Sequence, residues 1–137
     1  MRSFQDAFFV LHSEEELAAD KSFTRLAPYI VKMMAQSNRY RTSIISNYVN
    51  MVNPQLELQF SAVQLDLMDG SKNFCFRGTD DNIVAWKEDF NLGLGEVPAQ
   101  KLASEYLNRF GVGTSPIRVS GHSKGGNWQY MRQQPVK

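Results

Sequence analysis

The sequence predicts an α/β fold, with a helical N-terminal segment over residues 1–55 and a partial α/β core over residues 56–127. Three observations lead to this fold class. The hydrophobic period changes from helical to alternating at Leu56. An amphipathic helix that begins near Pro98 separates two short apolar strands, which is the pattern of a βαβ unit. The second of these strands leads directly into a glycine-rich turn around Ser123.

Composition narrows the class of protein further. With 42% hydrophobic and 21% charged residues, the 137-residue chain has the balance of one globular domain. Its formal net charge of +1 gives no electrostatic case for nucleic acid or anionic lipid as a partner. Cys75 is the only cysteine, and the chain shows neither a signal peptide nor the ~20 consecutive apolar residues of a membrane span. We therefore expect a cytoplasmic protein with no integral membrane segment.

The first 55 residues have helical signals. Ser13 followed by Glu16 matches a capping box. A second helix is expected from Phe23 to Met34, with Pro28 early enough to be tolerated near its first turn. We interpret its apolar stripe as core packing; the stripe consists of Phe23, Leu26, Ala27, Ile30, Val31 and Met34.

The core segment begins with a predicted β-hairpin. Apolar residues alternate from Ser61 to Leu67, and Asp69-Gly70 supplies the residues of a tight turn. The next strand, Asn73 to Phe76, is apolar at nearly every position, as in a strand covered on both faces. Residues 83–90 follow as a short helix or an ordered loop.

A longer helix and a second strand complete the predicted βαβ unit. Pro98 suits the first helical position, an apolar face extends to Phe110, and Gly111 is a plausible C-terminal stop. The strand Ile117 to Ser120 follows.

Gly121-x-Ser123-x-Gly125 matches the pattern of a nucleophile elbow. In this motif a serine lies on a tight strand-to-helix turn, and flanking glycines remove side chains that would collide there. Gly126 is expected to relieve crowding further. The alternative is a glycine-rich loop with an incidental serine, and the pattern alone does not separate the two.

Phe76-Arg77-Gly78-Thr79 follows the earlier buried strand. Acyl transfer needs two hydrogen-bond donors aimed at the developing oxyanion. One is expected from the backbone amide of Lys124, after the nucleophile, and the other from a loop such as that containing Thr79. The alternative for Thr79 is an ordinary turn at the end of a strand.

The combination of these motifs resembles a known family. Phe76-Arg77-Gly78-Thr79, Trp86-x-x-Asp89 and Gly121-His122-Ser123-x-Gly125-Gly126 occur in the order found in class-3 lipases. The longer stretch of sequence over Gln59–Asn127 is similar to the bacterial Mbeg-like proteins, a family of unknown function related to those lipases. The resemblance implies an α/β-hydrolase fold, Ser123 as nucleophile, and Thr79 with Lys124 at the oxyanion hole.

The sequence does not offer the remaining triad members in the usual order. In this fold an acid and then a histidine follow the serine, yet residues 124–137 contain no Asp, Glu or His. His122 matches a family position that is not the base, and we assign it a structural role. His12, the other histidine, lies where the resemblance gives no catalytic support.

No cofactor or metal is expected. Asp80, Asp81 and Asp89 could suggest a cation site, but Asp89 is better explained as a partner of the Arg77 region, and no His/Cys cluster favours a transition metal.

Residues 128–137 depart from the family pattern. They form a polar tail where a helix of small and apolar residues is expected. Deleting one nucleotide from a coding sequence for Leu-Ala-Val-Tyr-Ala-Ala-Ala-Thr-Cys-Lys gives the first nine tail residues and the first two nucleotides of a lysine codon. The hypothesis is that the chain is truncated or frameshifted after Asn127.

The functional prediction is therefore a fragment of a lipase- or esterase-like serine hydrolase acting on a small ester or lipid-like substrate. This chain is expected to be inactive, because it lacks the acid and the histidine of the triad. The alternatives are a non-catalytic binding or interaction protein and a truncated gene product without function.

Overall fold

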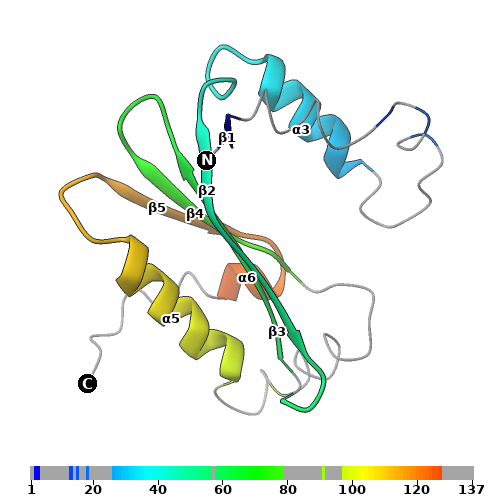
Figure 1. The fold of residues 1–137 in the computed structure, drawn as a ribbon, viewed down its shortest axis with the longest axis vertical. Helices are drawn as coiled ribbons and strands as arrows, with labels where there is room; N and C mark the ends of the chain where they lie inside the picture. The colour runs from blue at the N-terminus through cyan, green and yellow to red at the C-terminus, as the bar shows by residue number, and fades with distance from the viewer. Residues whose placement is uncertain are drawn as a thin grey trace.

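The computed structural model describes residues 2–3, 13, 15, 18, 26–56, 58–78, 91 and 97–127. Its elements are β1 (Arg2–Ser3), α3 (Ala27–Gln36), β2 (Ile44–Asn53), β3 (Leu58–Asp66), β4 (Lys72–Phe76), α5 (Pro98–Phe110), β5 (Ile117–Gly121) and α6 (Lys124–Asn127). The strands form one sheet in the order β1-β2-β3-β4-β5 (Figure 1). Neighbouring strands are antiparallel except β4 and β5, which are parallel. The fold is therefore mixed α/β, as predicted.

The strand β2 corrects the expectation of a wholly helical N-terminal segment. The helix α3 forms as expected, with Pro28 in its first turn, but residues 44–53 form a ten-residue strand paired with β3. The register shifts between Ser46 and Val49, and Asn47 adopts a φ of +51° there. This bulge breaks the alternation of side chains that would otherwise have indicated a strand.

The apolar face of α3 also differs from the prediction. Leu26 is 63% exposed and Ile30 is 58% exposed, so these two side chains do not pack in a core. Val31, another member of the predicted stripe, is half-buried and packs against the buried Ala35. Helical spacing identified the helix, but only part of the predicted stripe is buried.

The β3–β4 hairpin forms as predicted. Ala62 pairs with Phe76, and the antiparallel register continues to the turn. Gly70 has a φ of +78°, a conformation that favours glycine. The Asp69 carboxylate accepts hydrogen bonds from the backbone amide and the hydroxyl of Ser71, which close the turn.

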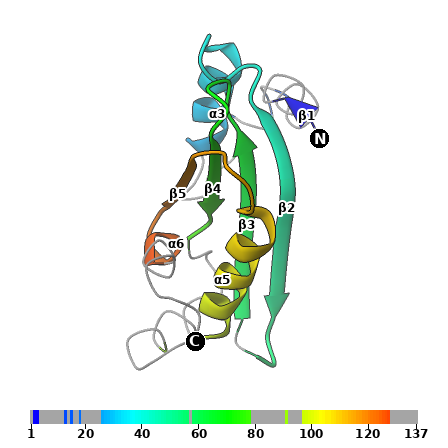
Figure 2. The same cartoon turned by 90° about the vertical axis from the view of Figure 1, so that its left-hand side faces the viewer.

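The main core lies between α5 and one face of the sheet (Figure 2). Side chains from β3, β4, α5 and the residue that precedes α5 form it: Leu58, Phe60, Ala62, Phe74, Phe76, Val97, Ala99, Ala103 and Tyr106. Phe74 is fully buried, and its ring meets that of Tyr106 edge-on with centroids 5.9 Å apart. The Tyr106 hydroxyl donates to the Asn47 carbonyl at 2.8 Å, which ties α5 to the bulge in β2.

The parallel pair β4–β5 is connected through α5, so the predicted βαβ unit is confirmed. Within the described ranges, none of the helices has the length and apolar character needed to cross a membrane.

The sequence predicted that β4 would be covered on both faces, but the two faces differ in burial. Phe74 and Phe76 point to the α5 side and are buried, whereas Asn73 and Cys75 point to the other side and are half-buried. On that side the Ser120 hydroxyl donates to the Cys75 sulfur at 3.3 Å. Burial raises the pKa of the Cys75 thiol, which keeps it in the less reactive protonated form.

Candidate active site

The chain turns sharply between β5 and α6. β5 ends at Gly121 and α6 begins at Lys124, so two residues make the connection. One of them is Ser123, whose φ of +54° lies in the left-handed region. A serine rarely adopts this conformation, which costs on the order of 1–3 kcal/mol and persists only where the surrounding structure imposes it. Ser123 is exposed at the tip of the turn.

The glycines on both sides of Ser123 are required by close backbone contacts. A Cβ atom on Gly121 would lie 2.2 Å from the Gly125 carbonyl oxygen, and one on Gly125 would lie 2.3 Å from the Phe76 carbonyl oxygen. The predicted steric role of these two glycines is confirmed. Among the described residues, a Cβ on Gly126 would meet nothing closer than 3.5 Å, so the crowding predicted at Gly126 is not found there.

The end of β4 lies against the elbow. A Cβ atom on Gly78 would be 2.6 Å from the His122 carbonyl oxygen and 3.3 Å from the Ser123 Cβ. The structure thus brings together Phe76-Arg77-Gly78 and the Gly-x-Ser-x-Gly motif, as the sequence predicted. Thr79 lies outside the described residues, and its role as an oxyanion donor stays a prediction.

Two backbone hydrogen bonds hold the turn. The Gly125 amide donates to the His122 carbonyl and the Gly126 amide donates to the Ser123 carbonyl, each at 2.9 Å. The His122 side chain is exposed, and the role predicted for it stays a prediction.

The side chain of Lys124 is a feature that the sequence did not reveal. Lys124 is 4% exposed, and its Nζ lies 3.4 Å from Oε1 of Gln59, which is 2% exposed. Gln59 belongs to β3, so this contact joins the elbow to a strand 65 residues earlier in the chain. Lysine and glutamine are usually exposed, and nothing in their local sequence marks them as buried.

The other candidate groups are not placed by the structure. His12, Asp80, Asp81 and Asp89 lie outside the described residues. In the part of the chain that is described, no three His, Cys, Asp or Glu residues are grouped so as to hold a metal ion. Arg77, the expected partner of Asp89, donates to the Asn50 side chain at 3.1 Å.

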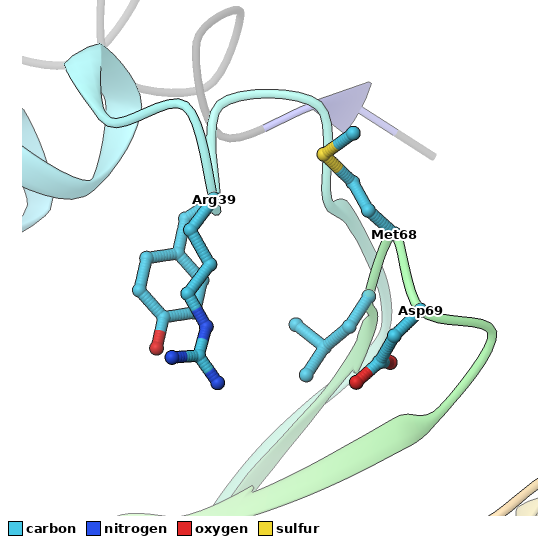
Figure 3. Close-up of a pocket in the computed structure, with 5 residues that line it drawn as sticks. Arg39, Met68 and Asp69 are labelled. Atoms are coloured by element: carbon cyan, nitrogen blue, oxygen red, sulfur yellow. The ribbon is translucent and has the colours of Figure 1, made fainter.

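A small pocket of about 130 Å³ lies at the opposite end of β4. Its lining residues are Arg39, Tyr40, Leu67, Met68 and Asp69. Arg39 and Asp69 face it from opposite sides (Figure 3). Ser123 lies close to Gly78, just past the other end of the strand, so this pocket takes no part in chemistry at the serine.

The fold and the site define a mixed α/β protein with a serine elbow at the C-terminal end of its parallel strands. A family model described as Mbeg1-like matches residues 34–134. The chain therefore belongs to the Mbeg1-like family, as the motif resemblance predicted. Searches of curated proteins and of solved structures gave no match. The relation to class-3 lipases and the truncation after Asn127 stay predictions.

Proposed function

We propose that Ser123 is the nucleophile of a lipase- or esterase-like serine hydrolase that acts on acyl esters. The observation that carries the proposal is the left-handed backbone of Ser123, held between Gly121 and Gly125 in a strand–turn–helix connection. A strained serine conformation of this kind is the structural context that the nucleophile-elbow motif requires.

The reaction would proceed through an acyl-enzyme. The Ser123 oxygen attacks the ester carbonyl carbon, its proton passes to a base and then to the leaving alcohol, and water releases the acid. The backbone amide of Lys124 is the first proposed oxyanion donor, and the Thr79 amide or hydroxyl is the second. Loss of triad members lowers the turnover of serine hydrolases by about 10⁴–10⁶, so a test of the nucleophile should not depend on turnover.

Covalent labelling is a more sensitive test than turnover. A fluorophosphonate should phosphonylate the Ser123 oxygen with release of fluoride, detected as an increase in intact mass and located by peptide mapping. We expect Ser123→Ala to abolish this labelling. Ser120→Ala is the matched control, because Ser120 is a half-buried serine on the adjoining strand, and it should be labelled like the wild type.

Equal labelling of wild type and Ser123→Ala would contradict the assignment of the nucleophile. Absence of labelling from the wild type would favour a non-catalytic binding protein.

A further inference from the structure

Lys124 has an unusual position for a lysine in a turn. Among the residues that the structure describes, it is the only charged side chain in the buried set. Its neighbour Ser123 is exposed. The lysine side chain therefore runs from the exposed turn into the interior, where its Nζ meets the Gln59 side chain.

Burying an ammonium group carries a large desolvation cost, which hydrogen bonds must offset. Gln59 Oε1 accepts one such bond at 3.4 Å, and Gln59 is itself buried in β3. The contact fixes the far end of the lysine side chain to the sheet. The near end of the side chain is attached to the Cα atom of Lys124, the residue that directly follows the strained Ser123.

The geometry points to Lys124 and Gln59 as positioning residues for the elbow, an inference that rests on the proposed function of Ser123. The Ser123–Lys124 peptide carries the proposed oxyanion donor. The left-handed φ of Ser123, +54°, persists only where the surrounding structure holds the chain on both sides of it. The hydrogen bond to the His122 carbonyl holds the peptide before Ser123, and the one to the Ser123 carbonyl holds the peptide after it. The buried side chain of Lys124 anchors the chain immediately beyond Ser123 to β3.

The first experiment measures fluorophosphonate labelling of the full chain, with kinact separated from the reagent affinity KI. Lys124→Met keeps an unbranched side chain one atom shorter and removes its charge, and Gln59→Met removes the acceptor. We expect each to lower kinact about tenfold or more, the effect of losing one hydrogen bond to a charged group, with KI unchanged. Gln59→Glu retains an acceptor for the lysine, so its kinact should equal that of the wild type rather than that of Gln59→Met.

A double variant and a matched control sharpen this test. The proposal has the two residues position the elbow through their mutual contact, so Lys124→Met combined with Gln59→Met should be no slower than either single variant. Lys101→Met, which changes an exposed lysine on α5, should label at the wild-type rate. Full additivity of the two single variants, or an unchanged kinact in both, would overturn the proposal.

A second experiment does not depend on activity. Amide hydrogen exchange in residues 123–126 should be about tenfold faster in Lys124→Met and Gln59→Met than in the wild type, while exchange in α5 is unchanged. Unchanged exchange in residues 123–126 would overturn the positioning role even if Ser123 is the nucleophile. If the wild type is not labelled, the proposed function fails and the exchange result still decides the role of Lys124. If Lys124→Met does not fold, Gln59→Met and Gln59→Glu give the same comparison.

Discussion

Replacing Gly125 by alanine should open the contact between α6 and β4. The new Cβ would lie 2.3 Å from the Phe76 carbonyl oxygen and 2.9 Å from the Arg77 carbonyl oxygen, whereas ordinary contact begins at 3.4 Å. Both oxygens belong to the backbone, so no side-chain rotation can relieve the clash. The elbow must move away from the end of β4 by about an ångström.

Forcing extra volume into a packed site typically costs about 1–3 kcal/mol. For a domain of 137 residues, this corresponds to a melting temperature lower by roughly 3–12 °C. Thermal unfolding followed by circular dichroism measures it. Gly126→Ala is the matched control, because its Cβ would have an ordinary contact of 3.5 Å and alanine favours a helix by about 1 kcal/mol over glycine. A Gly125→Ala melting temperature equal to that of wild type, or an equal decrease in Gly126→Ala, would refute the steric reasoning.

Two further predictions concern hydrogen bonds away from the elbow. Tyr106→Phe removes the 2.8 Å bond to the Asn47 carbonyl and should destabilise the fold by about 1–2 kcal/mol in denaturant titration. Tyr48→Phe, at a side chain 64% exposed, should have no effect, and equal results for the two would contradict the role of the bond. Hydrogen bonds from Ser71 lower the pKa of Asp69 from 3.8 to about 2, so the stabilisation is complete above pH 3.8 and is lost as the pH falls through 2. The stability difference between wild type and Asp69→Ala should therefore narrow over this range, and a constant difference would show that the carboxylate is not responsible.

Local signals in the sequence were sufficient to predict many of the elements that form the core. Asp69-Gly70 between two apolar runs predicted the β3–β4 hairpin, and the structure has it. Pro98 and Gly111 predicted the two ends of α5, which runs from Pro98 to Phe110. In each case the residues that form the turn or cap are neighbours in the chain, so their chemistry can be read without knowing the tertiary structure.

The errors came from features that depend on distant contacts. β2 is a strand because it pairs with β3, and the bulge at Asn47 disrupts the alternation that would have indicated it. The same distinction applies at the site. Gly121 and Gly125 belong to a local motif and were predicted, whereas the burial of Lys124 depends on Gln59, a residue 65 positions away.

Phe76 connects the stability of the core to the geometry of the elbow. Its ring is buried on the α5 side of the sheet, with its centroid 5.9 Å from that of Tyr106. Its carbonyl oxygen is the atom that requires glycine at position 125, and its pairing with Gly121 sets the register at which β5 ends. The backbone that supports Ser123 is therefore held by the same residue that α5 packs against. A serine in a strained conformation needs such support, because relaxation of β4 would release the strain and move the nucleophile.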